Sequence, residues 1–434
     1  MKIAMLTNAY PYYPGEQFIE DEIAFWANNP AASVTLLPTV ATGKPRSLPD
    51  GVSVDLGMAS GTRVGRFWFI WVALFSTIFR RELIHLWRSR RVGAYTALRA
   101  LLHTSKVLEQ ARCLEQYAKA NGKIDVAYCY WNEAQSYAAL LAKARGSVRK
   151  VVSRAHGFDL YEMRRKHEYM PLKRQFIHAY DRIFALSDEG RAYLEDTYGA
   201  PSENIKISSL GVPLTSTLSR PSPAGSLHVV SVSFCVPVKR LDRIIDALSL
   251  FSHQHAQIKT TWTHIGTGPL FDEVRELARV RLAHISNLSF EFLGDMPNQV
   301  VKTYYLNTPV DLFMNTSESE GMGVSIMEAM SAGVPALAPD VGGVSSLVSN
   351  ECGALLSPSP STQEIAAAIG RVALEDEGHA LRMQARKVIE ERFNSARTYR
   401  DFVAEVLALG ANAEAGQTGG LPPKGRSDHA DART

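Results

Sequence analysis

Short apolar runs alternate with longer stretches of helical periodicity through the first half of the chain. The apolar runs cover residues 2–6, 34–37, 125–130, 151–154, 182–186 and 205–210. Runs of this length and composition predict strands that are buried on both faces. Because helical stretches separate them, we expect the strands to be parallel and to form one sheet covered by helices.

The pattern restarts in the second half, with predicted strands at residues 229–234, 260–265, 288–293, 311–315 and 335–338. The segment 213–226 between the halves is rich in Pro and Ser, which is typical of a linker. The end, residues 410–434, has no periodicity and is predicted to be disordered. We therefore expect an α/β protein with two Rossmann-like domains, residues 1–212 and 227–409. In open sheets, ligands bind beyond the carboxyl ends of the strands, so two facing domains place the site in the cleft between them.

Composition narrows the class of protein. A chain of 434 residues with 46% hydrophobic residues suits two globular domains. The net charge of +3 indicates no nucleic-acid partner, and the four cysteines lack metal-ligand or redox spacing, which favours a reduced, cytoplasmic protein. The amino terminus begins in a predicted strand without a signal-peptide pattern. No apolar run reaches the ~20 residues of a membrane-spanning helix.

Residues 317–335, SESEGMGVSIMEAMSAGVP, carry the most informative pattern. They predict a loop with Gly321 and Gly323 between a buried strand and a short helix at about residues 324–332. Gly333 and Pro335 end this helix. The first turn of a helix has free backbone N–H groups and a positive dipole end. The loop therefore predicts an anion site, most often a phosphate site.

Two glutamates bracket this anion site. Glu320 lies in the loop and Glu328 lies on the helix behind it, so both carboxylates can accept hydrogen bonds from sugar hydroxyls. The alternative is that the glutamates only balance the helix dipole. However, Met327, Ala329 and Met330 make the helix apolar, and a buried helix rarely carries a carboxylate without a partner. We therefore interpret the segment as a nucleotide-sugar site.

The run EGMGVSIMEAMSAGVP resembles the E-x7-E signature of the retaining family-4 glycosyltransferases. Those enzymes have two facing Rossmann-like domains with parallel sheets and an interdomain cleft, the GT-B fold. The resemblance implies that Glu320 contacts the donor sugar and that Glu328 holds the ribose. It also implies that the sugar and its phosphate lie against the backbone of the donor-binding residues Gly321, Met322, Gly323 and Val324.

Lys239 lies between the end of a predicted strand and the next helix, where its charge can neutralise a departing diphosphate. The alternative is a solvated lysine beside Arg240. The family places a lysine here against the phosphates, but it commonly has an arginine five residues earlier, where this chain has Phe234. Arg240 and Arg154 are candidate sources of the missing charge, and the sequence does not decide between them.

Gly266 and Gly268 form a second strand-to-helix turn. A lone G-x-G motif is equally consistent with a tight turn that contacts no ligand. The resemblance implies that this turn is a wall of the donor cleft. It also implies that the loop through Asp295 and Met296 holds the base.

The candidate acceptor residues lie in the first half. His156, after predicted strand 151–154, can donate to a sugar hydroxyl, position an acceptor or handle a proton, or it can only cap a turn. The H-G-x-D pattern of His156 and Asp159 resembles the family's histidine near the reacting sugar. The resemblance also places an acceptor-facing loop at residues 8–23, with Gly15 and Glu16 as candidate contacts. The alternative for this loop is a plain connection between strand and helix.

Residues 67–79 are nearly all apolar and include Trp68 and Trp71. Seven arginines flank them within residues 62–91 against Glu82 alone, so the local charge is about +6. The apolar run is too short to cross a bilayer. Tryptophan flanked by arginine is typical of a helix at an anionic membrane surface, and the alternative is a buried helix with basic ends. Attachment to the inner face of the cell membrane would suit a lipid-linked acceptor.

These features predict a retaining glycosyltransferase that moves a hexose-type sugar from a UDP- or GDP-linked donor to a sugar or lipid-linked oligosaccharide acceptor. Glu320, Lys239 and His156 are the predicted catalytic residues. No Asp-x-Asp motif stands where it would hold a metal, and we expect neither metal nor cofactor. The S-E-S-E-G and K-R-L-D words resemble members that build bacterial exopolysaccharide, capsule or O-antigen.

Two alternatives remain open. One is another GT-B enzyme, either a sugar epimerase or a phosphorylase with bound pyridoxal phosphate. The other is a non-catalytic, membrane-associated scaffold, which only Phe234 favours.

Overall fold

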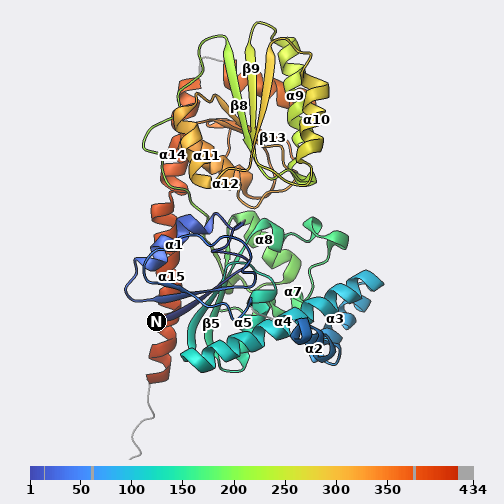
Figure 1. Cartoon of the computed structure of the whole chain (residues 1–434), viewed down its shortest axis with the longest axis vertical. Helices are drawn as coiled ribbons and strands as arrows, with labels where there is room; N and C mark the ends of the chain where they lie inside the picture. Colours follow the sequence, from blue (N-terminus) through green and yellow to red (C-terminus); the bar gives the residue numbers. More distant parts are fainter. Residues whose placement is uncertain (14, 60–62, 375–377, 419–434) are drawn as a thin grey trace, which may run out of the picture.

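The computed structural model describes residues 1–13, 15–59, 63–374 and 378–418. They form two α/β domains, one above the other in Figure 1. Each domain holds one sheet in which every strand pairing is parallel. The predicted fold class, two Rossmann-like domains, is therefore confirmed.

The amino-terminal sheet has the strand order β3-β2-β1-β4-β5-β6-β7. Its strands are β1 (Lys2–Thr7), β2 (Ser33–Pro38), β3 (Val52–Val54), β4 (Ile124–Cys129), β5 (Val148–Ala155), β6 (Arg182–Ala185) and β7 (Ile205–Ile207). The helices are α1 (Ile19–Ala27), α2 (Arg63–Leu74), α3 (Thr77–Arg88), α4 (Ala94–Asn121), α5 (Ala134–Ala144), α6 (Gly157–Leu160), α7 (Lys173–Phe176) and α8 (Asp188–Tyr198).

The carboxyl-terminal sheet has the strand order β10-β9-β8-β11-β12-β13. Its strands are β8 (Ser226–Val232), β9 (Lys259–Ile265), β10 (Leu288–Gly294), β11 (Leu312–Met314), β12 (Ala336–Pro339) and β13 (Gly353–Leu356). The helices are α9 (Leu241–Gln254), α10 (Phe271–Leu282), α11 (Asn298–Asn307), α12 (Val324–Ser331), α13 (Thr362–Leu374), α14 (Gly378–Arg392) and α15 (Ser395–Thr418).

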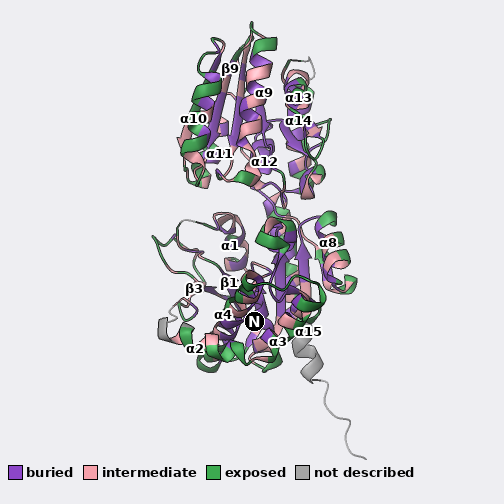
Figure 2. Cartoon of the chain, turned by 90° about the vertical axis from the view of Figure 1, so that its right-hand side faces the viewer, coloured by how far each residue is buried: buried purple, intermediate pink, exposed green. Residues whose placement is uncertain are grey.

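Both sheets are covered by helices on both faces, which buries the apolar runs that the sequence shows. In the amino-terminal domain, α4 and α5 pack on one face and α1 and α15 on the other. In the carboxyl-terminal domain, α9, α10 and α13 cover one face and α11, α12 and α14 the other. Figure 2 shows the buried strands enclosed by helices whose outer surfaces are exposed. The sequence pattern missed only β3 and β13 among the described strands.

Helix α15 differs from the predicted domain boundaries. It was expected to end within the carboxyl-terminal domain at residue 409, but it runs to Thr418 and lies along the amino-terminal domain (Figure 1). Phe402, Val403 and Val406 join the core of that domain. An amphipathic pattern shows which face of a helix is buried but not which sheet covers it. The remainder of the predicted tail, residues 419–434, lies outside the described residues.

The chain passes between the domains twice, near Val212 and near Asn394, and these two segments lie side by side. Val212 pairs with Asn394, and the Ser395 amide donates to the Val212 carbonyl at 3.0 Å. A Cβ on Gly211 would lie 2.3 Å from Thr398 Oγ1, so glycine allows this close approach. The segment 213–226, predicted as a linker, is held on the carboxyl-terminal domain, where the Thr215 hydroxyl donates to the Ser331 carbonyl at 2.7 Å.

The apolar and basic segment at residues 62–91 forms two helices, α2 and α3, with Ser76 as the N-cap of α3. The reading as a buried helix holds for one face only: Phe79 and Leu86 are buried, but other large apolar side chains on this segment are exposed. They are Phe67, Trp68, Trp71, Phe75, Ile84 and Trp87, with exposed fractions of 49–74%. Among the described residues, no helix has the length and hydropathy needed to cross a bilayer.

Candidate active site

The site lies where the two sheets face each other. Each sheet has a topological switch point, at which the strand order changes direction. It lies between β1 and β4 in the amino-terminal sheet and between β8 and β11 in the carboxyl-terminal sheet. Open α/β sheets bind ligands beyond the carboxyl ends of the strands at such a point. The domains meet there, because a Cβ on Gly157 would lie 3.0 Å from the Gly321 amide nitrogen. A second contact between the domains is the ion pair of Lys302 on α11 with Asp21 on α1 at 2.8 Å.

The amino-terminal end of α12 is built as the sequence predicts. Gly323 is the N-cap and has a left-handed φ of +66°, which a side chain would oppose because a Cβ would lie 2.8 Å from Ile326 Cδ1. In the part of the chain that the structure describes, none of the amides of residues 321–325 donates a hydrogen bond. These free amides and the helix dipole make an anion site.

Glu320 lies at this end, and the fold fixes its orientation. Its Oε1 accepts hydrogen bonds from Lys239 Nζ (2.5 Å), Ser317 Oγ (2.7 Å) and Asn315 Nδ2 (3.0 Å). Oε2 accepts none within the described chain and is left for a ligand. Burial alone would raise the pKa of Glu320, but the charge and hydrogen bond of Lys239, helped by Ser317 and Asn315, hold this pKa below its usual value.

Glu328 is on α12 itself and is also buried, with an exposed fraction of 5%. It accepts a hydrogen bond from Asn298, and Lys302 lies nearby. These partners do not offset the loss of solvent, and burial raises the pKa of Glu328 to about 7. The ionised carboxylate in this environment would be stabilised by hydroxyl donors such as those of a ribose.

The basic residues that were predicted to bind the diphosphate do not lie together. Lys239 lies at the site, as its ion pair with Glu320 shows. Arg240 is ion-paired with Asp242 at 2.9 Å and also with Glu318. Phe234, where the resembling family has arginine, is 57% exposed.

Arg154, the other candidate for the missing charge, is ruled out as a diphosphate ligand. It is fully buried and forms a 2.8 Å ion pair with the fully buried Glu22. Its guanidinium lies over the ring of Phe402 on α15, with 3.9 Å from Cζ to the ring centroid. Arg154 therefore holds the amino-terminal domain together, beneath α1 and α15.

Gly266 and Gly268 bring two strand-end loops together. A Cβ on Gly266 would lie 2.0 Å from the Ser233 carbonyl oxygen, and one on Gly268 would lie 2.7 Å from the Cys235 nitrogen. The Cys235 amide also donates to the Thr267 carbonyl at 2.7 Å. The glycines therefore shape the loop that positions Lys239, and no contact to a ligand is needed to explain them.

His156 faces this region from the amino-terminal domain. Its ring packs against Tyr130 and Trp131, with centroids 4.9 and 4.6 Å away. The residue is only 9% exposed, yet neither ring nitrogen has a hydrogen-bond partner in the described chain. Buried polar atoms are nearly always paired, so a ligand hydroxyl is the expected partner.

Asp159 supports His156 and is fully buried, so its carboxylate is not open to an acceptor. Its Oδ1 accepts from the His156 amide at 2.5 Å and its Oδ2 from the Asn132 amide at 2.6 Å. Lys173 is fully buried beneath this loop and donates to Asn132 Oδ1 at 2.7 Å. Sequence reasoning missed Asn132 and Lys173, which no local motif marks.

The loop before α1 is organised in the same way. The Glu16 carboxylate accepts from the amides of Asn8 (2.9 Å), Ala9 (2.6 Å) and Tyr10 (2.6 Å) and from the Trp131 indole (2.6 Å). Glu16 therefore closes the loop and braces Trp131 against His156. Gly15 has a φ of +119° and open space around its Cβ position, so it supplies the turn. Pro14 lies outside the described residues.

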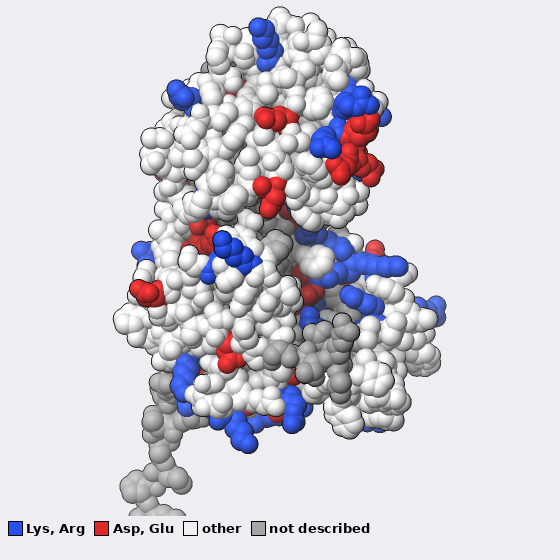
Figure 3. All heavy atoms as spheres, viewed as in Figure 1, with Lys and Arg blue, Asp and Glu red and all other residues white. Residues whose placement is uncertain are grey.

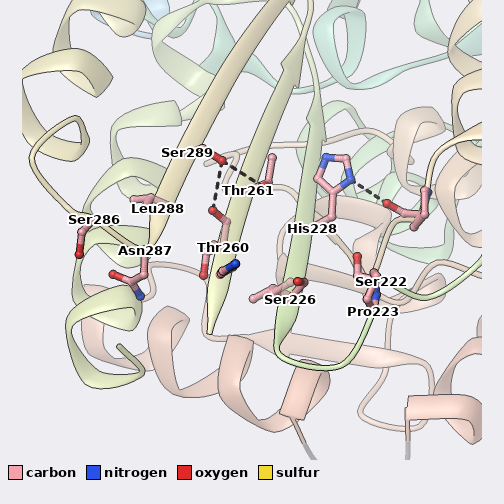
Figure 4. Close-up of a pocket in the computed structure, with 13 residues that line it drawn as sticks. Ser222, Pro223, Ser226, His228, Thr260, Thr261, Ser286, Asn287, Leu288 and Ser289 are labelled. Atoms are coloured by element: carbon pink, nitrogen blue, oxygen red, sulfur yellow. Dashed lines mark hydrogen bonds between the residues drawn. The ribbon is translucent and has the colours of Figure 1, made fainter. Parts of the chain in front are cut away.

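A hollow in the carboxyl-terminal domain lies elsewhere (Figure 4). Residues at the amino ends of β8, β9 and β10 line it, whereas Glu320 follows the carboxyl end of β11. Its polar groups bond to one another: Thr261 with Ser289 at 3.1 Å, and His228 Nδ1 with the Pro309 carbonyl at 2.7 Å. Among the described residues, no group of three His, Cys, Asp or Glu side chains could hold a metal ion.

Comparison with known proteins identifies the class of enzyme. Residues 70–216 match the family model described as Glycosyltransferase Family 4, and residues 219–390 match the model described as Glycosyl transferases group 1. The protein WcaL of Escherichia coli K12, assigned as a colanic acid biosynthesis glycosyltransferase, is 26% identical over 66% of this chain and 71% of its own length. The amylovoran biosynthesis glycosyltransferase AmsK of Erwinia amylovora is 26% identical over 48% of this chain and 52% of its own.

Solved structures agree with the fold. The apo lipopolysaccharide outer core galactosyltransferase WaaB matches with a TM-score of 0.65 and 17% identity, covering 96% of this chain and all of WaaB. Anabaena HepE in complex with UDP-glucose matches with a TM-score of 0.62 and 18% identity, covering 94% of this chain and 99% of HepE. The two family models and the curated relatives, rather than the solved structures, favour a transferase over an epimerase, a phosphorylase or a scaffold. The chain belongs to the family-4 glycosyltransferases with the GT-B fold.

Proposed function

We propose that this glycosyltransferase moves a sugar, with retention of configuration, from a nucleoside-diphosphate donor to a glycan acceptor in surface polysaccharide biosynthesis. One observation carries the proposal: two buried carboxylates, Glu320 and Glu328, flank the free amide end of α12 where the domains face each other. An amide end suits phosphate, and carboxylates suit hydroxyls. The names of WcaL and AmsK, and the UDP-glucose bound to HepE, support the same donor class and pathway type.

The residues divide the work by position. The bond between the sugar's anomeric carbon and the β-phosphate oxygen breaks, and its electron pair leaves on the diphosphate, which Lys239 and the α12 amides stabilise. The acceptor hydroxyl oxygen bonds to the anomeric carbon, and its proton passes to the departing phosphate. Glu320 Oε2 holds the donor sugar and His156 holds a hydroxyl beside it. Glu328 binds the ribose.

A donor panel tests this function. The protein is incubated with UDP-, GDP- and ADP-sugars, and transfer and slow donor hydrolysis are measured by release of the nucleoside diphosphate. We expect one donor to be used and Glu320→Gln to lower its turnover at least 100-fold. Glu318→Gln is the matched control, because Glu318 is half exposed and pairs with Arg240 outside the anion site. No turnover by the native protein, or full turnover by Glu320→Gln, would overturn the proposal.

We also propose that transfer needs no metal, because Lys239 and the α12 amides supply positive charge at the diphosphate. Turnover in excess EDTA should equal turnover in Mg²⁺. Loss of activity with EDTA that Mg²⁺ restores would overturn this part.

We further propose that α2 and α3 attach the enzyme to the inner face of the cell membrane, where it meets a lipid-linked acceptor. The support is the exposure of Trp68, Trp71 and Trp87, at 65%, 51% and 71%, together with exposed arginines within α3 and directly after it. Exposed tryptophans are costly in water and favourable at a lipid interface, and arginines attract anionic headgroups.

A further inference from the structure

We propose that Arg164, on the amino-terminal domain, supplies the second positive charge at the donor's diphosphate, the charge that Phe234 cannot provide. The proposal rests on the proposed function, since it concerns the same donor. A nucleoside diphosphate leaving group gains negative charge as the sugar departs, and Lys239 already shares its charge with Glu320. A second cation at this place is therefore expected on electrostatic grounds.

Arg164 lies where the two domains touch. It ends the 3₁₀ helix Glu162–Arg164, which follows the His156 loop. A Cβ on Gly157 would lie 2.3 Å from Arg164 Nη1 and 3.0 Å from the Gly321 amide nitrogen. The Arg164 guanidinium and Gly321, the first residue of the anion-binding loop, therefore both lie close to the position that a side chain on Gly157 would occupy.

The guanidinium of Arg164 is free to bind an anion. Within the described chain it makes no hydrogen bond and no ion pair, and it is partly exposed. Its neighbour Arg165 is already engaged, because it pairs with Glu133 and donates to the Phe158 carbonyl at 2.9 Å. Figure 3 shows Lys and Arg side chains gathered on the amino-terminal domain just below the hollow between the domains.

The arrangement explains how a chain without the usual arginine still holds a diphosphate. Lys239 approaches the phosphates from the carboxyl-terminal domain and Arg164 from the facing domain. A planar guanidinium can hold two phosphate oxygens at once. Because the two cations come from different domains, the diphosphate itself draws the domains together and completes the site.

Binding of UDP and UMP to the native protein and to Arg164→Met and Arg164→Lys tests the proposal. If UDP is not the base that the native protein binds, GDP and GMP take their place. Methionine keeps the apolar stem, so folding is retained. We expect Arg164→Met to weaken UDP binding about 100-fold and UMP binding less than threefold, because UMP lacks the β-phosphate, with partial recovery in Arg164→Lys. Arg279→Ala, a surface arginine on α10 paired with Glu276, is the control and should bind like the native protein.

The outcomes separate this inference from the function itself. UDP binding by Arg164→Met within threefold of native, with only the acceptor KM raised, would overturn the inference and assign Arg164 to the acceptor. An equal loss of UDP and UMP binding would also overturn it, because the contact would then not be to the β-phosphate. Failure of the native protein to bind any nucleoside diphosphate would instead overturn the proposed function.

Discussion

At the scale of residues, the site is marked by buried polar groups that lack partners. The amides at the start of α12 and both nitrogens of His156 donate and accept nothing in the described chain. Glu328 is buried with too few donors to keep its usual pKa. Leaving such groups unpaired costs free energy, which a bound ligand with phosphates and hydroxyls would recover.

His156→Ala should lower kcat about 100-fold or more, while the affinity for the nucleoside diphosphate stays within threefold of native. The reason is that His156 comes from the domain opposite α12 and meets the sugar rather than the nucleotide. Steady-state kinetics and calorimetry check the two effects. His253→Ala, on the exposed face of α9, should be neutral. An unchanged kcat in His156→Ala would contradict this role.

The raised pKa of Glu328 predicts that the folded protein loses stability as the pH rises. An unfolded glutamate has a pKa of about 4.3 and the folded one about 7, so the folded state holds the proton more tightly. The free energy of unfolding therefore contains a contribution that is present below pH 4 and is lost as the pH rises through 7. Thermal unfolding from pH 5 to pH 8 should show a smaller loss of stability for Glu328→Gln than for the native protein. Parallel curves would contradict the assignment.

The same carboxyl should release a proton when the donor binds. Ribose hydroxyls donate to the ionised form, which lowers its pKa, so at pH 7 about half a proton is released per nucleotide-sugar bound. The intact donor is the right ligand, because its phosphates do not titrate near pH 7. Calorimetry in buffers of different ionisation enthalpy measures the release, and Glu328→Gln should abolish it. Release of the same size in Glu328→Gln would assign the proton to another group.

Sequence reasoning found the residues whose position is set locally, each by the strand, loop and helix to which it belongs. Glu320, Glu328 and Lys239 each sit at a fixed offset from a strand end or a helix start, so the local pattern predicts their place. Arg164 and Lys173 act through contacts with segments far along the chain, and no spacing shows those contacts. Arg154 had the right charge but was placed in the interior by its pairing with Glu22.

At the scale of elements, the apolar runs located most of the described strands, but they did not show which elements pack against each other. All strands except β3 and β13 were predictable, because each is an apolar run between helical stretches. Helix α15 was not assigned to the correct domain, and the sequence left open whether the apolar segment of α2 and α3 is buried or exposed. Both depend on which surfaces remain uncovered after folding.

The α2–α3 surface should bind anionic vesicles. In co-sedimentation, the native protein is expected to bind vesicles with phosphatidylglycerol more strongly than pure phosphatidylcholine, and less so in high salt. A variant with serine at Trp68, Trp71, Phe75 and Trp87 should bind at least 10-fold more weakly, because each aromatic side chain contributes buried apolar area. It should still transfer sugar to a water-soluble acceptor.

A matched variant controls for the loss of exposed apolar area alone. Val280→Ser with Met383→Ser alters residues that are 57% and 47% exposed on the carboxyl-terminal domain, and vesicle binding should not change. Equal vesicle binding by the native protein and the four-serine variant would remove the membrane proposal without touching the donor site.

At the scale of the whole molecule, the two domains touch through glycine. Gly157 and Gly321 come into close contact, and the Lys302–Asp21 ion pair is a second contact between the domains. The paired crossings at Val212 and Asn394 give the domains a common hinge. A site with groups from both domains works only when the domains can approach.

Gly157→Ala should keep the domains apart. Its Cβ would lie 3.0 Å from the Gly321 nitrogen and would also displace Arg164. We expect kcat to fall at least 10-fold and small-angle scattering with donor to show a larger radius of gyration than in the native complex. Gly370→Ala, whose Cβ meets nothing closer than 3.8 Å, is the control. A native-like kcat in Gly157→Ala would show that close approach at this point is dispensable.

The most direct test is a crystal structure with the nucleoside diphosphate that the protein binds. We predict phosphate oxygens within hydrogen-bond distance of the amides of residues 322–325, ribose hydroxyls on Glu328, and Glu320 Oε2 facing the space for the sugar. A nucleotide bound away from the start of α12, or with its ribose remote from Glu328, would contradict the account.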